Sequence, residues 1–335
     1  MKVTVTFPKG FDPQPRGQAA TLYDCFLFYN ELDLLEIRLR ELDPVVDYFV
    51  LAESNETFRG QAKQLWFENN KCRFEPFLHK IVHIVTSDTA AAGKYHPVKV
   101  RKGNLPWTRE GAQRNALIEG LRQARGQDWV VLSDVDEIPN ARIVDRIARQ
   151  TAYRRGCYVF EQDFFEVRLN WRPKMAMTWT GSRMIERRFL RTMQGLRRFK
   201  SAASPDSLVP WLDWRAQCCW DTRSLIFPQR IPNAGWHFSS IGTAEHIRNK
   251  FTSYSHWDHD MDQSFYELDK LRTRVAEGRL HGGEGSIVVP LSHLPACIGQ
   301  NADKFKHLLD MEAHPHREWL PAGAPIAGDI ALDRV

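Results

Sequence analysis

The chain has 335 residues, of which 43% are hydrophobic and 26% are charged, as is usual for a soluble globular protein. The net charge of +5 is small and the basic residues are dispersed among acids, which argues against nucleic-acid binding. The densest basic run, RRFK at 197–200, is interpreted as a solvated turn. No apolar run approaches the ~20 residues that cross a bilayer, and the N-terminus lacks the apolar core of a signal peptide. We therefore expect a cytoplasmic protein without a transmembrane segment, and peripheral membrane contact stays open.

The six cysteines form no C-x-x-C pair and show no framework spacing. Adjacent Cys218 and Cys219 cannot easily bridge each other. We expect all six to be reduced and mostly buried, as suits a reducing compartment.

The first half of the chain alternates strand and helix patterns. Residues 1–20 are rich in Pro and Gly and predict a loosely held arm. Residues 22–42 predict a short strand and then a helix with its leucines mostly inward. The pattern continues with strands at 45–52 and 79–85, a helix at 106–125, a strand at 128–133 and a helix at about 139–150. This alternation predicts an α/β domain with a mostly parallel sheet.

The second half has a different texture. Residues 156–171 alternate as one long strand, and two helices are expected at about 243–253 and 261–277. Tryptophans gather between these elements and could stack on sugars, although core packing explains most tryptophans. They are Trp171, Trp179, Trp211, Trp214 and Trp220. The run HWDHD at 256–260 fits no standard zinc pattern and is interpreted as a solvated turn.

Three acids follow the strand at 128–133. Asp134, Asp136 and Glu137 lie close enough to raise one another's pKa unless a cation sits among them. In open α/β sheets, ligands bind outside the carboxyl ends of the strands, which is where these acids lie. The preceding helix must run back along the sheet, so its N-terminus reaches the same edge. Extending its apolar stripe backwards brings Arg114 and Glu110 to that edge as well.

Three chemistries place closely spaced acids after a strand. A calcium loop of the EF-hand type is excluded, because Ile138 and Pro139 occupy the positions that need an oxygen ligand and a glycine. A phosphatase of the haloacid-dehalogenase type would use Asp134 as nucleophile, but no Asp–Asp pair follows to hold its magnesium. A nucleotide-sugar glycosyltransferase uses D-x-D to hold a metal that bridges the donor diphosphate. A non-catalytic carbohydrate-binding protein built on the tryptophans is a further alternative.

Six stretches, in this order, resemble glycosyltransferase family 17. They are YDCFLFYNELDLLEIRLREL, VVDYFVLAESNETFRG, HKIVHIV, REGAQRNAL, SDVDEIP and GWHFSS. The resemblance implies a Rossmann-like GT-A fold over residues 21–310, with helices on both faces of the sheet. It divides this domain into a nucleotide-sugar half at 21–150 and an acceptor half at 151–310, with a tail at 311–335. Without a visible anchor, the chain is similar to a bacterial-type cytoplasmic member.

The resemblance also implies a reaction. The reaction is an inverting transfer of a sugar from a UDP-sugar to a glycan or glycolipid acceptor. In the known member of the family this sugar is N-acetylglucosamine. The implied cofactor is Mn²⁺ or Mg²⁺. By analogy with GT-A enzymes, Asp136 binds the metal directly, and Asp134 contacts the ribose or a metal-bound water. His237 completes the metal site, and imidazole suits Mn²⁺ better than Mg²⁺. Glu137 either supports these ligands or is an acid at a helix N-terminus.

The remaining candidates bind the donor or take the acceptor's proton. Arg109 and Arg114 are expected to meet phosphate or the donor sugar, since arginine forms bidentate contacts with anions. The loop after the first core strand is expected to meet uridine and ribose through Glu53, Ser54 and Asn55. An inverting transfer needs one carboxylate as general base. The sequence leaves three candidates open, which are Asp163, Glu166 and Glu245.

Overall fold

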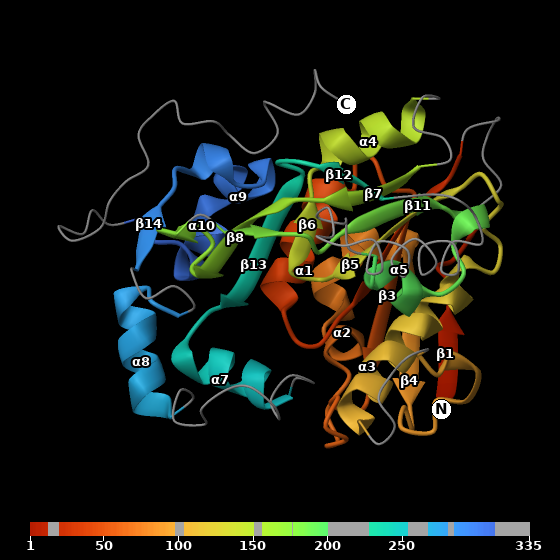
Figure 1. The fold of residues 1–335 in the computed structure, drawn as a ribbon, viewed down its shortest axis with the longest axis horizontal. Coiled ribbons are helices and arrows are strands. Elements are labelled where there is room, and N and C mark those ends of the chain that lie inside the picture. The colour runs from red at the N-terminus through yellow and green to blue at the C-terminus, as the bar shows by residue number, and fades with distance from the viewer. Residues whose placement is uncertain are drawn as a thin grey trace, which may run out of the picture.

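The computed structural model describes residues 1–12, 20–97, 104–150, 156–175, 177–199, 228–253, 267–280 and 285–311. A large mixed sheet forms its centre (Figure 1). In sheet order its strands are β1 (Lys2–Thr6), β4 (Ile81–Ser87), β3 (Tyr48–Ser54), β2 (Leu22–Leu27), β5 (Trp129–Asp134), β11 (Arg183–Glu186), β7 (Cys157–Phe160) and β12 (Pro228–Ile231). The four neighbours β4, β3, β2 and β5 are parallel. The predicted α/β class is therefore confirmed.

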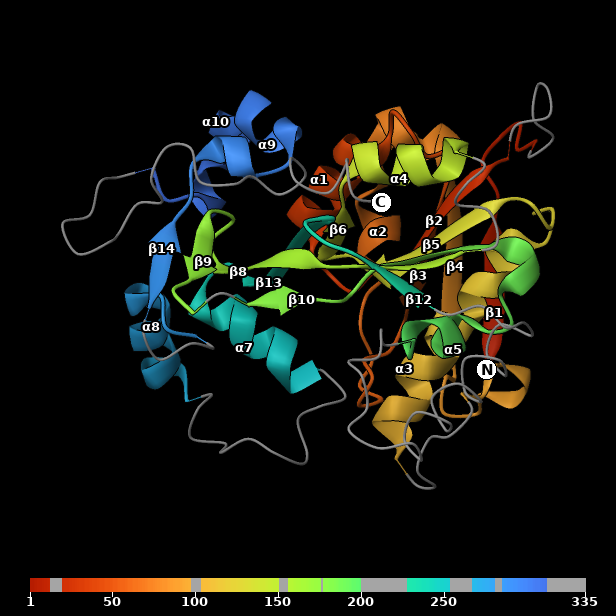
Figure 2. The same ribbon diagram turned by 45° about the horizontal axis from the view of Figure 1, so that its top comes forward.

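Alternation along the central strands builds a core on each face of this sheet. In β2, Leu22 and Phe26 pack on one face, whereas Tyr23 and Cys25 pack on the other. Figure 2 shows α1 (Leu32–Leu42) and α4 (Ala141–Arg149) on the first face, and α3 (Leu105–Ala116) and α5 (Met193–Arg197) on the second. The prediction of helices on both faces is confirmed, and the strands between them are buried on both sides.

A smaller sheet continues from the large one. Its order is β10 (Thr178–Trp179), β8 (Gln162–Val167), β13 (Gly235–Ile241) and β6 (Glu137–Pro139). Beyond it, β9 (Trp171–Pro173) pairs with β14 (Ser286–Val288). Strand β5 ends at Asp134 and β6 begins at Glu137, so the chain passes from one sheet to the other within the acidic run. The three acids therefore lie at the junction of the two sheets.

Helices fill the remaining surface. They are α2 (Trp66–Asn69), α7 (Ala244–Ser253), α8 (Leu268–Glu277), α9 (Ala296–Gln300) and α10 (Ala302–Phe305). Helix α7 matches its prediction, and α8 matches the described part of the helix expected at 261–277. None of the helices in the described ranges is long and apolar enough to cross a membrane.

Several predicted boundaries are wrong. The N-terminal arm contains β1, which pairs antiparallel with β4. The single strand expected at 156–171 is divided into β7 and β8, because the chain leaves the large sheet after Phe160 and enters the smaller one at Gln162, and β9 begins at Trp171. The helix expected from 106 is α-helical only to Ala116 and continues as a 3₁₀ helix over Leu117–Leu121.

The helix expected from Pro139 begins later. Pro139 ends β6, and Asn140 caps α4 by accepting a hydrogen bond from the backbone N–H of Arg142. Among the other predicted features, Cys25, Cys157 and Cys297 are buried thiols, whereas Cys72 is a free cysteine at the surface. Outside the described residues lie Cys218, Cys219, Trp211, Trp214, Trp220 and the run at 256–260.

Candidate functional site

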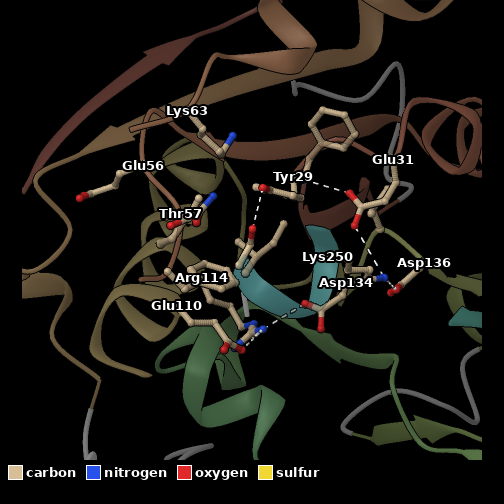
Figure 3. Close-up of a pocket in the computed structure, with 16 residues that line it drawn as sticks. Tyr29, Glu31, Glu56, Thr57, Lys63, Glu110, Arg114, Asp134, Asp136 and Lys250 are labelled. Atoms are coloured by element: carbon tan, nitrogen blue, oxygen red, sulfur yellow. Dashed lines mark hydrogen bonds and ion pairs between the residues drawn. The ribbon is translucent and has the colours of Figure 1, made fainter. Parts of the chain in front are cut away.

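A pocket opens at the carboxyl edge of the central strands, between the loops after β2 and β3, the end of β5 with its following loop, helix α3 and the last turn of α7. Figure 3 shows charged side chains from all of these elements pointing into it. They are Glu31, Lys63, Glu110, Arg114, Asp134, Asp136 and Lys250. The prediction that Arg114 and Glu110 reach the same edge as the aspartates is confirmed. The stripe on α3 places them there because it continues the apolar face that packs on the sheet.

Asp134 lies between two guanidinium groups. Its Oδ1 accepts a hydrogen bond from Arg114 at 3.0 Å, and its Oδ2 accepts one from Arg197 at 2.8 Å. Burial by itself raises the pKa of this carboxyl, but the charges of Arg197 and Arg114 hold the pKa well below its usual range. Asp134 is therefore ionised, and both of its oxygens face arginine.

Arg197 also binds Glu137, and this overturns the interpretation of RRFK as a solvated turn. Its two Nη atoms lie 2.7 Å from the two carboxylate oxygens of Glu137. The same carboxylate accepts hydrogen bonds from the backbone N–H of Asp134 at 2.8 Å and from the indole of Trp179 at 2.5 Å. Glu137 is a buried strand residue that supports the loop, so its alternative role as an acid at a helix N-terminus is wrong.

The backbone of the acidic loop is braced from α1. Nη1 of buried Arg38 donates to the carbonyl oxygens of Asp134 at 3.1 Å and Glu137 at 2.9 Å. The guanidinium also pairs with Asp24 at 2.5 Å and donates to Ser133 Oγ at 2.6 Å. With its charge balanced by Asp24, Arg38 fixes the loop geometry without competing for the aspartates.

Asp136 pairs with a lysine. Nζ of Lys250, from α7, lies 2.6 Å from Asp136 Oδ2 and 3.7 Å from Glu31 Oε1. Lys250 and Asp136 are each 5% exposed. The acids at the end of β5 therefore coexist because the protein supplies its own cations: arginines for Asp134 and Glu137, and a lysine for Asp136.

His237 comes to the same place through the pairing of β13 with β6. It lies opposite Glu137 in that register. Gly235 makes the approach feasible, because it has φ +144° and a Cβ there would collide with the carbonyl of Ile138. The imidazole stacks on Trp179 with the ring centroids 4.7 Å apart. Its Nε2 is 3.9 Å from Asp136 Oδ1.

The surroundings of His237 fit a metal ligand. Burial lowers the pKa of His237 below its usual value, so the ring is neutral. Its Nδ1 has no hydrogen-bond partner among the described residues. A carboxylate oxygen of Asp136 and an imidazole nitrogen form a donor pair that suits Mn²⁺. No group of three or more His, Cys, Asp or Glu side chains within the described ranges could hold a metal. Within the described ranges an ion here would have Asp136 and His237 as its protein ligands, since Asp134 faces arginines, and oxygens of water or substrate would fill its other positions.

Two of the expected donor contacts face inward. The carboxylate of Glu53 is fully buried and accepts hydrogen bonds from the backbone N–H groups of Phe67 and Glu68, both at 3.1 Å. Ser54 is also buried and donates to the carbonyl of Thr86 at 3.0 Å. Neither side chain lines the pocket, and Asn55 lies exposed at the start of the following loop.

Arg109 acts on that same loop. It donates to the carbonyl of Phe58 at 3.3 Å and packs against Gly60, where a Cβ would collide with its guanidinium. The loop lines the pocket with Glu56, Thr57 and Phe58, so Arg109 shapes the pocket without lining it.

The three candidate bases lie in different environments. Side chains alternate along β8, so Glu166 shares a face with Phe164, which contacts His237, whereas Asp163 faces the opposite side. Glu166 is fully buried, and burial raises the pKa of Asp163. Glu245 lies at the start of α7 and pairs with Arg272 at 2.8 Å on the outer surface. The structure thus separates Glu245 from the acidic loop.

Sequence reasoning missed Arg197, Lys250 and the contacts of Trp179. Arg197 belongs to RRFK, the densest basic run in the sequence, and this clustering of basic residues is a signal from which a role in anion pairing could have been predicted. Lys250 lies in a helix of mixed charge and had no local signal.

Two comparisons with known proteins agree on a family of glycosyltransferases. Residues 10–185 match the model of glycosyltransferase family 17. The chain is 26% identical over 333 residues to the rat, mouse and human proteins named beta-1,4-mannosyl-glycoprotein 4-beta-N-acetylglucosaminyltransferase. These matches cover 91% of this chain and 56–57% of each relative, so the chain spans about half their length. The family match includes both aspartates, whereas Arg197, His237 and Lys250 lie beyond it.

Two solved structures resemble about two thirds of the chain. 4-Diphosphocytidyl-2C-methyl-D-erythritol synthase from Anaerococcus prevotii is 8% identical with a TM-score of 0.34, covering 68% of this chain and 93% of that one. 2-C-Methyl-D-erythritol 4-phosphate cytidylyltransferase from Francisella tularensis is 11% identical with a TM-score of 0.33, covering 69% and 98%. Likeness at this level supports no conclusion about function.

Proposed function

The chain belongs to glycosyltransferase family 17, and on this premise we propose that it is a metal-dependent inverting glycosyltransferase. The proposed donor is a UDP-sugar, with N-acetylglucosamine as the sugar, and the proposed acceptor is a glycan or glycolipid. One observation carries the proposal: Asp136, His237 and Lys250 meet at the carboxyl edge of the parallel strands, beside a pocket. This edge is where α/β sheets bind nucleotides. The names of the rat, mouse and human relatives support the choice of sugar.

The residues at the pocket have three different roles in the proposed reaction. Asp136 and His237 would hold Mn²⁺, and the bound ion would supply positive charge for the departing diphosphate. Arg114 and Arg197 keep Asp134 ionised, and Arg38 keeps the loop in place. The loop carrying Glu56, Thr57 and Phe58 forms the far wall of the pocket, where a nucleoside would fit.

The acceptor side lies toward the smaller sheet. Trp179 is 39% exposed, although it stacks on His237 and donates to Glu137. An exposed aromatic ring beside a metal site suits stacking against an acceptor sugar. Of the three candidate bases, Glu166 shares the His237 face of the smaller sheet, and we propose it ahead of Asp163 and Glu245. In an inverting transfer its role is to take the proton from the attacking hydroxyl.

The alternatives have less support. A phosphatase nucleophile needs a carboxylate oxygen that can attack phosphorus, but each oxygen of Asp134 accepts a hydrogen bond from an arginine. A non-catalytic carbohydrate-binding protein would use the five tryptophans that gather in the second half of the sequence, and of these five only Trp171 and Trp179 lie in the described residues. It would also bind glycans regardless of UDP and of metal.

A thermal-shift panel tests the proposal. The protein is heated with UDP, UDP-N-acetylglucosamine and other UDP-sugars, each with Mn²⁺ and with EDTA. We expect stabilisation by UDP compounds only with Mn²⁺, and slow release of UDP from the preferred donor. Release of phosphate from a generic phosphomonoester would support the phosphatase instead. Glycan binding that ignores both UDP and EDTA would support the binding protein.

A further inference from the structure

Lys250 is an unusual residue to find at the base of this pocket. Its ammonium lies between two carboxylates, 2.6 Å from Asp136 and 3.7 Å from Glu31, and it is 5% exposed (Figure 3). A buried ammonium loses hydration and is retained only where partners replace the water. Here the main partner is also the carboxylate that would take the metal. The Lys250 ammonium and a metal ion would thus compete for the carboxylate of Asp136.

Helix α7 is fixed so that Lys250 points into the pocket. One helical turn further on, Ser253 Oγ lies 2.9 Å from the hydroxyl of Tyr29, on the loop that follows β2. Both Lys250 and Ser253 line the pocket. The ammonium therefore stands where a negatively charged ligand entering the pocket would meet it.

We propose that Lys250 is a diphosphate-binding residue that keeps the affinity for the metal ion low until the nucleotide is bound. This inference rests on the proposed function. Lys250 neutralises Asp136 in the free protein, and its positive charge there opposes a divalent ion between Asp136 and His237. When a nucleoside diphosphate enters, its negative charges attract Lys250 away from Asp136, and the carboxylate turns to the ion. Metal and nucleotide then raise each other's affinity by the same factor, as linkage requires.

The test uses Lys250→Met, which removes the charge and keeps the length of the side chain. Mn²⁺ affinity is measured without nucleotide by electron paramagnetic resonance, and UDP affinity is measured by calorimetry with Mn²⁺ saturating. We expect Lys250→Met to bind Mn²⁺ about tenfold more tightly than wild type without UDP, and to bind UDP about tenfold or more weakly, as for a lost charge-assisted contact. The Mn²⁺–UDP coupling should be smaller in Lys250→Met than in the wild type, and what is left of it comes from the ion's own contact with the diphosphate. Lys250→Arg should recover part of the lost coupling.

Arg248→Met is the matched control, because it removes a cation from the exposed side of the same helix. Both of its affinities should equal those of wild type. If Lys250→Met keeps wild-type affinities and loses only melting temperature, Lys250 is a structural clamp and the inference is overturned. Should that variant not fold, the wild type decides: Mn²⁺ affinity that is equal with and without UDP overturns the inference too. A wild type that binds no UDP in any metal condition overturns the proposed function itself.

Discussion

Nη2 of Arg197 lies 2.8 Å from Oδ2 of Asp134, across 63 residues of sequence. The same guanidinium binds both oxygens of Glu137. One arginine therefore joins the last residue of β5 to the first residue of β6, and so ties the two sheets together where their acids would otherwise repel.

Replacing Arg197 by Met should destabilise the protein strongly. The change leaves buried Glu137 without its cation, and breaking a buried pair by removing one partner costs about 3–5 kcal/mol. Urea unfolding gives the free energy directly. Arg149→Met is the control, since its pair with Asp145 is exposed on α4 and such pairs contribute about 0–1 kcal/mol. Equal losses for the two variants would contradict the role assigned to Arg197.

Asp136→Asn should abolish the Mn²⁺ dependence of UDP binding. In the structure this carboxylate also balances the charge of buried Lys250. The neutral amide leaves Lys250 with a weaker partner, so the free energy of unfolding should also fall by about 1–3 kcal/mol. Calorimetry with and without Mn²⁺, alongside urea unfolding, measures both effects. Undiminished Mn²⁺ dependence would remove Asp136 from the metal site.

His237→Ala should weaken Mn²⁺ binding and narrow its advantage over Mg²⁺, because only oxygen ligands remain. The wild type should show a pH profile that the variant lacks. Burial lowers the pKa of His237, so protons compete with Mn²⁺ only below the usual histidine value of about 6.5. Mn²⁺ affinity with UDP saturating should thus be level from pH 8 to about 6.5 and fall below it. Identical profiles for both proteins would return His237 to a packing role.

Trp179→Ala should raise the KM for the acceptor while UDP affinity changes little. A stacked aromatic contact contributes about 0.5–1.5 kcal/mol, which corresponds to roughly 2- to 12-fold in affinity. Trp179→Phe keeps a ring on His237 but loses the hydrogen bond to Glu137, so its acceptor KM should lie between those of wild type and the alanine variant. A loss of UDP affinity with an unchanged acceptor KM would place the indole on the donor side.

Glu41→Gln should change how stability depends on pH. Burial raises the pKa of Glu41 to about 7. A hydrogen bond that the carboxylate accepts from the backbone N–H of Ala141 at 3.4 Å lowers this pKa somewhat. Between the unfolded value of about 4.3 and pH 7 the folded protein binds more protons than the unfolded chain, so stability falls as pH rises.

The glutamine is neutral at every pH and should remove that slope. Since Glu41 is partly exposed, we expect the variant to be more stable above pH 7 by only about 1–2 kcal/mol. Thermal unfolding at half-unit steps from pH 4.5 to 8 would show the difference, and parallel curves for the two proteins would contradict it.

Local patterns in the sequence determined the class of the fold and the edge that carries the site. The strand that ends at Asp134 is a continuous apolar run, and the stripe of α3 that continues to Arg114 repeats at helical spacing. Each pattern involves only a few neighbouring residues, so it can be read without knowing what packs against it. Asp134 and Arg114 both lie at the predicted edge, with Nη2 of Arg114 3.0 Å from Oδ1 of Asp134.

Only the tertiary structure decided which charges neutralise the acids. Lys250 meets Asp136 across 114 residues, and His237 reaches the loop through the register of β13 with β6. The same topology turned Glu53 inward, although its loop begins at the predicted edge. A lysine or a glutamate has the same local spacing whether its partner is water or a buried ion. What distinguishes these cases is loss of water and the approach of an opposite charge, and both arise only when distant segments fold against each other.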